Sequence, residues 1–472
     1  MFQKTLLTDE QVEPLAEGVF EVLEQVGVLC QNEEMLRALD AAGAEVDYAP
    51  ERATFPREMV AEFIEDFRRE NAESGDDAAA KFTAPGLPGI GTQVAQLYHD
   101  YAKQETRSAN SKDFIALTKL GDVLHGDGGV GHSLSMTDCP PALEPLEAGL
   151  LLAEYAHNPG RPFAWRVDQV DYLKEMGEIL GIEDWFSWGA TCFAHPLRFD
   201  RDVADKFARR CREGVSAGLT AMPVAGVSTP VTVEGFIVVS SAEHVATWIA
   251  ARAINPDVGL SGSMWAGTVD MKTGSVSYAA FDAMFYAFAS VEFLRRWCGK
   301  TIPVGGGEYC AAKVPGLYAA LEKADKAMMI AAFTGQPKGV GSGMLDDGKI
   351  LSPVQLMIER DLAEGVSFLA GDLDPTDENI AMPTIAEVDI GLRTNYLATE
   401  HTLRHFRSSL WLPEFIERAG WEGFDQETEM LDKTQQKANE LVAQYTKPAG
   451  REDQLAAMRT VIERARPKLL GP

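Results

Sequence analysis

The sequence predicts an α/β fold, a (β/α)8 TIM barrel that carries helical extensions at both ends of the chain. Two observations lead to this fold class. From residue 127 onward, short apolar segments alternate with segments of helical periodicity. Eight such apolar segments recur at intervals of about 30 to 45 residues, and eight is the number of strands in this barrel.

A doubly wound parallel sheet is the rival architecture. It would be favoured by a Gly-x-Gly-x-x-Gly turn directly after the first strand. Gly126, Gly128, Gly129 and Gly131 instead lie before or inside the first apolar segment, with a different spacing. The barrel is therefore the preferred prediction.

Residues 1–126 are predicted as a helical extension packed on the barrel. Apolar residues recur every three or four positions in several segments, and Thr8 with Gln11 matches a capping box at the first of them. Gly43 ends the second segment, and Pro56 precedes the third. The predicted helices are 8–28, 33–42, 57–69 and 111–123.

Residues 127–375 are predicted as the barrel, and residues 376–472 as helices packed against it. The predicted strands are 129–136, 162–167, 186–193, 216–224, 258–265, 301–305, 339–344 and 365–370. The helices between and after them are predicted at 142–157, 168–181, 200–213, 232–253, 278–298, 314–335 and 353–363.

The charge of the chain excludes some partners. Its formal net charge is -28 over 472 residues, so nucleic acid and anionic membranes are poor partners for its surface. Residues 1–10 lack the basic and apolar regions of a signal peptide, and no apolar run approaches the roughly 18 to 20 residues of a spanning helix. The six cysteines form no Cys-x-x-Cys motif, which favours reduced thiols. We therefore expect a cytoplasmic protein.

The strongest candidate site is the run from Pro303 to Cys310, where an apolar segment ends in three glycines. Glycine lets the backbone approach a ligand closely. Glu308 and Tyr309 follow the glycines directly, and together they offer a cation both a negative charge and an aromatic face. Glu308 is the predicted catalytic residue and Tyr309 a predicted substrate-binding residue.

Aromatic, Met and small residues also follow the other predicted strands. In a barrel the carboxyl ends of all strands meet on one face, so these side chains are predicted to share one pocket with Tyr309. Such a lining suits an alkylated ammonium group, although core packing is the commoner role for any one Trp. Cys192 and Cys310 lie near strand ends as well. The further predicted substrate-binding residues are Trp165, Trp188, Trp265, Tyr98, Met344, His195 and Arg166.

His401 and His405 are spaced for one face of a helix and are the best metal-ligand pair in the chain. No His-Glu-x-x-His glutamate lies between them, and the pair falls after the predicted barrel. No metal site is therefore predicted.

Five segments of the chain resemble the family of corrinoid-dependent trimethylamine methyltransferases. They are residues 7–47 (LTDEQVEPLAEGVF…AEVD), 216–235 (SAGLTAMPVAGVSTPVTVEG), 269–289 (VDMKTGSVSYAAFDAMFYAFA), 341–366 (GSGMLDDGKILSPVQLMIERDLAEGV) and 400–415 (EHTLRHFRSSLWLPEF). The resemblance implies a (β/α)8 barrel, a homo-oligomer, and transfer of a methyl group from a methylated amine to Co(I). The corrinoid (cobalamin) is then carried by a separate partner protein, and no cofactor belongs to the chain itself.

One departure from that family concerns the substrate. Its trimethylamine-specific members carry pyrrolysine near the active site, at a position that falls near 305–313 here, whereas this chain has only the twenty standard residues. The resemblance therefore implies a quaternary amine such as glycine betaine, proline betaine or carnitine. A betaine carboxylate would need Arg166, Arg198 or His195. The alternative is a non-catalytic binder or sensor of quaternary amines.

Overall fold

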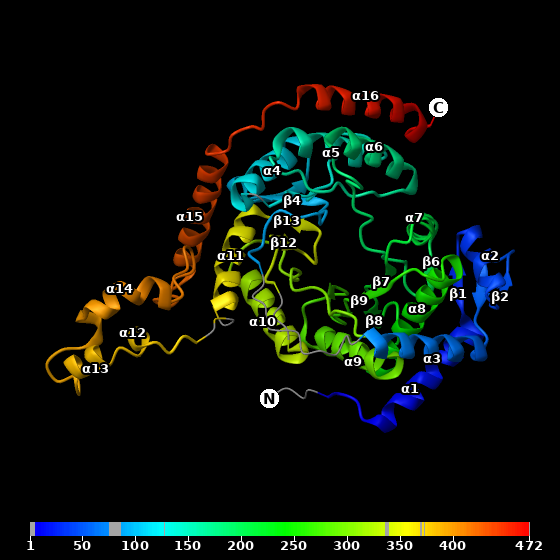
Figure 1. Cartoon of the computed structure of the whole chain (residues 1–472), viewed down its shortest axis with the longest axis horizontal. Coiled ribbons are helices and arrows are strands. Elements are labelled where there is room, and N and C mark those ends of the chain that lie inside the picture. The colour runs from blue at the N-terminus through cyan, green and yellow to red at the C-terminus, as the bar shows by residue number, and fades with distance from the viewer. Residues whose placement is uncertain are drawn as a thin grey trace.

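A computed structural model describes residues 5–74, 86–126, 128–335, 339–368, 371 and 373–471. The α/β class is confirmed, since helices and strands alternate through the middle of the chain. Figure 1 shows these elements arranged around a centre, with helices outermost. The helices are α1 (Asp9–Glu21), α2 (Glu33–Ala41), α3 (Arg57–Ser74), α4 (Ser111–His125), α5 (Glu144–Tyr155), α6 (Val170–Leu180), α7 (Arg201–Arg212), α8 (Val233–Ile254), α9 (Phe281–Cys298), α10 (Leu317–Thr334), α11 (Pro353–Phe368), α12 (Asp377–Ile380), α13 (Met382–Val388), α14 (Glu400–Ser409), α15 (Phe424–Ala443) and α16 (Glu452–Leu469).

The strands are short and fall into four small sheets. The first has the order β2-β3-β1-β6, the second β11-β10-β8, the third β12-β13-β4-β5, and the last pairs β7 with β9. The strands are β1 (Val28–Cys30), β2 (Glu45–Asp47), β3 (Arg52–Thr54), β4 (Leu97–Asp100), β5 (Glu105–Ser108), β6 (Arg198–Phe199), β7 (Ala217–Ala221), β8 (Val224–Ala225), β9 (Leu260–Met264), β10 (Gly267–Val269), β11 (Val276–Ser277), β12 (Met344–Leu345) and β13 (Ile350–Leu351).

Parallel contacts connect successive segments of the chain in order. β7 and β9 pair in parallel over five residues, and the Thr220 N–H donates to the Thr191 carbonyl at 2.9 Å. β13 pairs in parallel with β4. Isolated parallel bridges join Ala95 to Leu134, Val130 to Pro159, Phe163 to Ser187 and Met264 to Val304. The segments predicted as strands at 129–136, 162–167, 186–193 and 301–305 thus pair through single bridges, while 216–224 and 258–265 contain β7 and β9.

Two features differ from the predicted strand order. Residues 365–368 form the last turn of α11, so the strand predicted at 365–370 is wrong over its described part; residues 369 and 370 lie outside the described residues. The segment 1–126, predicted as a helical extension, also contains strands: β1, β2, β3, β5, and β4, which pairs with β13. At Gly365 an added Cβ would lie 3.2 Å from the Trp411 ring, so this glycine lets the ring pack on a helix.

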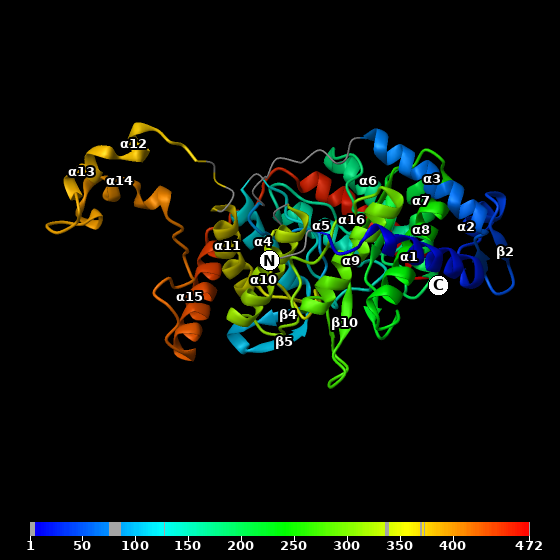
Figure 2. The same ribbon diagram turned by 90° about the horizontal axis from the view of Figure 1, so that it is seen from below.

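The predicted helices between the strands are all present, as α5 to α11. The N-terminal helices α1, α2 and α3 pack on α8 and α9, and α16 packs on α5 and α6. Two large apolar clusters fill the interior, one around α8 and the other around α5. Helices α12, α13 and α14, in contrast, project away from the other elements in both Figure 1 and Figure 2.

No helix in the described part of the chain is both long and apolar enough to cross a membrane.

Candidate functional site

The glycine run is held against the end of β9. Met264 forms a parallel bridge with Val304, and the Gly305 N–H donates to the Met264 carbonyl at 2.9 Å. A Cβ built on Gly305 would lie 2.0 Å from the Trp265 ring, and Gly306 has a φ of +93°. Neither position tolerates a side chain without a shift of its neighbours. The glycines therefore allow an indole ring to lie directly on the backbone that leads to Glu308.

Trp265 and Tyr309 form an aromatic pair at this point. Their ring centroids lie 4.8 Å apart at an interplanar angle of 56°. Gly348 approaches the other side of the pair, where an added Cβ would lie 2.5 Å from the Tyr309 ring. Both rings are half-buried, and so is Glu308. Trp265, at the end of one predicted strand, thus lies against Tyr309, which follows Glu308 after the end of another.

A buried lysine that the sequence analysis missed lies behind these residues. Lys326 of α10 is 1% exposed, and its Nζ donates to the Tyr278 carbonyl. A Cβ added to Gly306 would lie 2.5 Å from that Nζ. Burial lowers the pKa of Lys326 to about 8, although the charges of Glu308 and Asp347 act to raise it.

Asp347 completes this group. Its Oδ1 accepts a hydrogen bond from the Tyr278 N–H at 3.4 Å, so Tyr278 touches both the lysine and the carboxyl group. Burial raises the pKa of Asp347 to about 6. Two acidic side chains, Glu308 and Asp347, therefore lie near one lysine. The site carries a net negative charge beside two aromatic faces, which is the chemistry that binds a cation.

Cys192 lies near the same residues. Its thiol is exposed, yet burial raises its pKa to about 11, and its charge adds to the raised pKa values of Tyr278 and Tyr309. Cys310, by contrast, is completely buried, and its Sγ lies 3.6 Å from the Met344 carbonyl.

His195 is not free to bind a ligand through its ring nitrogens. Its Nε2 accepts a hydrogen bond from the Met222 N–H at 2.9 Å, and its Nδ1 lies 2.8 Å from Glu243 Oε2. Since Nε2 must accept, Nδ1 carries the proton and donates to Glu243. His195 thus fixes the backbone just beyond β7.

The other predicted substrate-binding residues have contacts of their own, and Met344, Trp188 and Tyr98 share an apolar cluster with Tyr309. Trp165 is 37% exposed and donates from Nε1 to Glu144. The Arg166 guanidinium pairs with Asp168 on the surface. Met344 is 1% exposed in the apolar core.

Trp188 contacts Phe186, with ring centroids 4.9 Å apart, and borders a small hollow of about 10 Å³. The buried Lys206 shares that hollow and donates to the Trp188 carbonyl at 3.4 Å. Burial lowers the pKa of Lys206 to about 8. The Trp188 backbone thus takes part in a polar contact with α7, while its ring packs on Phe186.

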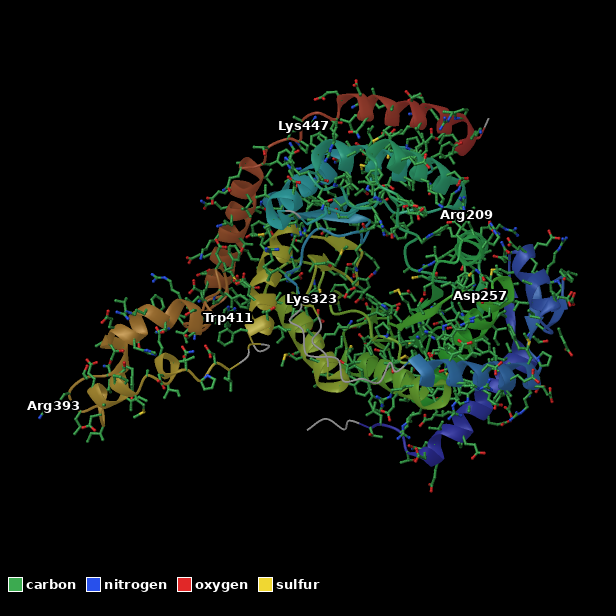
Figure 3. The ribbon with its side chains drawn as sticks, viewed as in Figure 1. Arg209, Asp257, Lys323, Arg393, Trp411 and Lys447 are labelled. Atoms are coloured by element: carbon green, nitrogen blue, oxygen red, sulfur yellow. The ribbon has the colours of Figure 1, made fainter. Side chains whose placement is uncertain are left out.

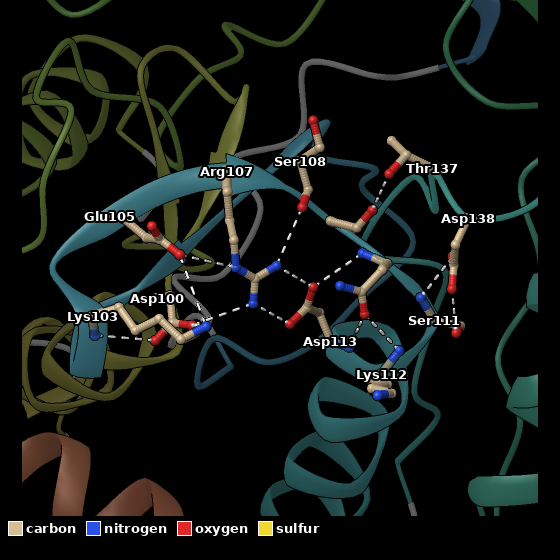
Figure 4. A network of polar contacts seen from close by, with 12 residues as sticks. Asp100, Lys103, Glu105, Arg107, Ser108, Ser111, Lys112, Asp113, Thr137 and Asp138 are labelled. Atoms are coloured by element: carbon tan, nitrogen blue, oxygen red, sulfur yellow. Dashed lines mark hydrogen bonds and ion pairs between the residues drawn. The ribbon is translucent and has the colours of Figure 1, made fainter.

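Tyr98 on β4 faces a different hollow, of about 170 Å³, which it shares with residues of α4 and α15 such as Leu117 and Ala438. The Arg107 guanidinium lies 5.2 Å from the centre of the Tyr98 ring. Figure 4 shows that Arg107 is itself held by Asp113, through two bonds of 2.6 and 2.7 Å, and by Asp100. This network ties the β4–β5 hairpin to the first turn of α4.

His401 and His405 meet as their spacing predicts, with ring centroids 4.4 Å apart. Among the described residues, no group of three or more His, Cys, Asp or Glu side chains is placed to hold a metal ion. The pair therefore carries no metal proposal.

The sequence did contain a signal for Lys326. Lys323 and Lys326 occupy the buried face of α10 together with Ala319, Ala327 and Ile330. A lysine on the apolar stripe of a helix must find polar partners or a functional site. Asp347 gave no comparable signal, because it lies in an ordinary turn sequence, Asp346-Asp347-Gly348.

Comparison with known proteins places the chain in a family. The family model described as Trimethylamine methyltransferase (MTTB) matches residues 2–469. The chain is 21% identical over 480 residues to the trimethylamine methyltransferase MttB of Desulfitobacterium hafniense (strain DSM 10664 / DCB-2), covering 97% of this chain and 93% of the relative. It is 20% identical over 465 residues to the glycine betaine methyltransferase of Desulfitobacterium hafniense (strain Y51), covering 94% and 93%. A trimethylamine methyltransferase MttB of Methanosarcina barkeri (strain Fusaro / DSM 804) is 27% identical over 215 residues, or 45% of this chain and 42% of the relative. The chain therefore belongs to the trimethylamine methyltransferase (MTTB) family.

Proposed function

We propose that this protein transfers a methyl group from a quaternary amine of the glycine betaine type to Co(I) of a separate corrinoid protein. The observation that carries the proposal is the pairing of Trp265 with Tyr309 beside Glu308. Two aromatic faces and a carboxylate together bind a methylated ammonium group, because the ring quadrupoles attract a diffuse positive charge. The relatives named for trimethylamine and for glycine betaine act on such groups.

The buried charges support the same choice of substrate. Glu308 and Asp347 outnumber Lys326 by one negative charge, so a cation neutralises the site. Lys326 keeps the negative charge moderate. The positive charge of the substrate disappears during the reaction, so a site that binds the charged ground state too tightly would slow the reaction.

The proposed reaction needs no proton transfer. An electron pair of Co(I) forms a bond to the methyl carbon, the carbon–nitrogen bond breaks, and nitrogen keeps the bonding pair as a neutral tertiary amine. The residues of this chain then act by orientation: the rings hold the remaining N-alkyl groups, and Glu308 holds the positive nitrogen. One methyl group points toward the partner protein.

A quaternary amine fits the residues near the glycine run better than trimethylamine. Positions 305–313 hold only standard residues, whereas the trimethylamine-specific enzymes of the family carry pyrrolysine. The three residues predicted for a betaine carboxylate each bind another group: Arg166 pairs with Asp168, Arg198 donates to the His195 carbonyl, and the His195 ring is held by Glu243 and Met222. The proposed recognition therefore centres on the ammonium end of the substrate.

The fold proposed for this chemistry is the (β/α)8 barrel, with residues 1–126 and 376–472 as extensions. Support comes from the parallel contacts, which follow chain order from Ala95 to Val304 while a helix separates most successive segments. In such a barrel the carboxyl ends of β7, β9 and the 301–305 segment meet on one face. Trp265 and Glu308 follow two of these ends.

The test uses the purified protein with Co(I) cobalamin and a panel of glycine betaine, proline betaine, carnitine, choline and trimethylamine. We expect methylcobalamin by absorbance, and the demethylated amine by mass spectrometry, for at least one quaternary amine. The doubly substituted Trp265→Ala/Tyr309→Ala protein serves as the control and should be inactive. If no quaternary amine donates a methyl group, the proposal fails. Calorimetric binding without transfer, even to the corrinoid partner, would support the alternative of a binder or sensor.

A further inference from the structure

Lys206 of α7 is buried beside neutral groups. The side chain is 8% exposed. Its Nζ donates to the Ala164 carbonyl at 2.9 Å and to the Trp188 carbonyl at 3.4 Å, and it lies 5.1 Å from the centre of the Phe163 ring. Burying a charge is costly unless an opposite charge pairs with it, and none of these partners is charged.

The other buried lysines among the described residues have acidic partners. Lys323 of α10, which Figure 3 labels, forms a completely buried ion pair with Glu359. Lys326 lies near the two acidic side chains of the candidate site. Lys206 differs from both, because no carboxylate in the described part of the chain lies within ion-pair distance of its ammonium group.

Arg210 brings a second positive charge to the same place. It lies one turn after Lys206 on α7, and the two side chains line the hollow of about 10 Å³ under that helix. The Arg210 Nη1 donates to the Gly189 carbonyl at 3.5 Å, whereas its Nε–H is buried without a hydrogen-bond partner among the described residues. A buried donor that stays unpaired costs free energy, so this N–H is a donor that a ligand can use.

The pKa values of the two cations show that their charged forms are disfavoured. Burial lowers the pKa of Lys206 to about 8, and Arg210 acts in the same direction, while Cys192, Asp202 and Asp200 act to raise it. Burial also lowers the pKa of Arg210. An anion bound in the hollow would offset these effects, because it favours the charged form of each side chain.

The hollow has the size of one atom and is accessible. A volume of about 10 Å³ is close to that of a single water-sized atom. Ala190 lines the hollow and is exposed, so the hollow can be reached by a ligand. One oxygen of a carboxylate group has the matching size and the matching charge.

Ala190 lies on the same side of its segment as Cys192. Both residues are exposed, while Thr191 and Phe193 are buried, which is the alternation of an extended segment. Cys192 in turn lies within electrostatic range of Tyr309. The accessible wall of the hollow therefore faces the aromatic pair of the candidate site.

We propose that Lys206 and Arg210 bind a carboxylate group, one oxygen of which enters the hollow. This oxygen accepts hydrogen bonds from the Lys206 ammonium and from the Arg210 Nε–H, and both bonds are charge-assisted. The two residues thus take the role that was predicted for Arg166, Arg198 and His195, each of which binds another group.

Two sources can supply the carboxylate. The first is the substrate, and this source rests on the proposed function: a betaine then places its ammonium group at the Trp265–Tyr309 pair and its carboxylate at α7. The second is a free carboxylate anion such as acetate, which binds whether or not the protein transfers a methyl group. Ligands that carry only one end of a betaine separate the two sources.

The experiment measures the melting temperature of the full chain against the concentration of each ligand, at constant ionic strength. The ligands are acetate, tetramethylammonium, glycine betaine, proline betaine and carnitine. A ligand that binds the folded state raises the melting temperature, and the concentration dependence gives its affinity. We expect Lys206→Met and Arg210→Met each to weaken the binding of a carboxylate ligand by about tenfold or more. Each variant is compared with itself in the absence of ligand, so a change in stability does not obscure the result.

Arg209→Met is the matched control. Arg209, which Figure 3 labels, precedes Arg210 on α7, but its guanidinium pairs with Asp171 and Glu213. This variant should bind every ligand as the wild type does. If Lys206→Met does not fold, Arg210→Met decides the test.

The pattern of losses identifies the source of the carboxylate. Weaker binding of a betaine in the variants, with tetramethylammonium unchanged, makes the substrate the source. Weaker binding of acetate alone makes the source a free anion, and this result holds even where no methyl transfer is found. The proposal is overturned if the wild type binds no carboxylate ligand, or if the variants bind these ligands as tightly as the wild type. An equal loss of tetramethylammonium binding also overturns it, because the variants would then act on the cation site.

Discussion

At the scale of single residues, substitution of the Trp265 and Tyr309 rings is the most direct test of the site. Removing either ring as Trp265→Ala or Tyr309→Ala should weaken binding of a quaternary amine by roughly 1 to 2 kcal/mol, or about 5- to 30-fold in Kd, because one face of the cation loses its π contact. Calorimetry with the preferred amine gives this value directly. Tyr48→Ala, at a 46% exposed ring far along the chain, is the control. Unchanged affinity in both site variants would remove the aromatic pair from the binding site.

We expect Glu308 to affect turnover or amine binding through its charge and not through its volume. Glu308→Gln keeps the size of the side chain, and since Glu308 is half-buried we expect little change in the melting temperature. Turnover or amine binding should fall by about tenfold or more, because a charge-assisted contact to the ammonium is lost. Steady-state kinetics and a thermal melt separate the two effects, with Glu62→Gln on the exposed surface of α3 as the matched change. A variant that is merely less stable, with normal kinetics, would make Glu308 a structural residue.

Asp347 introduces a pH dependence of stability. Burial raises its pKa from 3.8 to about 6 in the folded protein, opposed by Lys326 and Lys349 and assisted by Asp346. The folded state then holds the proton more tightly than the unfolded state, so the free energy of unfolding falls as pH rises from about 4 to about 6. Asp347→Asn removes the free-energy cost of ionising this buried carboxyl group. The variant should gain on the order of 2 kcal/mol above pH 7 and nothing below pH 4, as measured by urea unfolding at both values. An equal gain at both pH values would exclude ionisation as the cause.

The residues of the site differ in how far the sequence could predict them. Glu308 and Tyr309 could be singled out because they follow three glycines after an apolar segment, and Trp265 because it ends another apolar segment. Lys326 was missed because helical periodicity shows that a face is buried, but not which neighbour a lysine on that face will meet. His195 was predicted to bind the substrate, yet both of its ring nitrogens are hydrogen-bonded within the protein. The sequence could not show this, because Glu243 lies 48 positions away and only the fold brings it close.

At the scale of elements, paired histidine and glutamate residues hold the strand ends in place. His195 accepts from Met222 and donates to Glu243, which also accepts from the Leu197 N–H at 2.7 Å. His132 and Glu144 repeat the arrangement with the Phe163 and Met136 N–H groups. In both cases a glutamate from a later helix fixes the backbone beyond a strand. Such fully bonded buried networks make the positions of neighbouring residues more rigid.

The ion pair between Lys323 of α10 and Glu359 of α11 is a stability test at this scale. Both side chains are completely buried, and Glu359 also accepts the Gly343 N–H at 2.6 Å, just before β12. Lys323→Met should cost about 3 to 5 kcal/mol, because it leaves Glu359 as an uncompensated buried charge. Lys447→Met, at the exposed pair with Glu154, should cost less than about 1 kcal/mol. Urea unfolding of both variants makes the comparison, and Figure 3 shows the two lysines in their different surroundings. Equal costs would mean that Glu359 finds another partner.

Helices were easier to predict than strands because they carry their own periodicity. All seven helices expected between residues 142 and 363 are present, whereas several strands reduce to single bridges. β4 was missed since Leu97, Tyr98, His99 and Asp100 form no apolar run, and its partner β13 lies some 250 residues later. The apolar run at 365–368 was interpreted as a strand, but Trp411 packs over Gly365 and keeps the segment helical. Whether such a segment forms a strand depends on pairing partners far along the chain, and a single sequence does not reveal those partners.

At the scale of the whole molecule, the β10–β11 hairpin stands beside the candidate site. β10 begins two residues after Trp265, and Tyr278 just after β11 contacts Lys326 and Asp347. The hairpin projects from the body on the same side as β4 and β5 (Figure 2). Met271 at its tip is 84% exposed. Exposed apolar residues next to a site that is proposed to deliver a methyl group to another protein are candidates for the contact with that protein.

Under the proposed function, docking of the corrinoid protein on the hairpin can be tested separately from the chemistry of the amine. Met271→Asp should raise KM for the corrinoid protein about tenfold, because it puts a charge into an apolar contact, and it should leave methyl transfer to free Co(I) cobalamin unchanged. The control is Val26→Asp at a 44% exposed residue just before β1, which should alter neither reaction. The two acceptors are compared at one saturating amine concentration. If Met271→Asp slows transfer to free cobalamin as much as transfer to the protein, the hairpin shapes the amine site itself. If it slows neither, the partner docks elsewhere on that face.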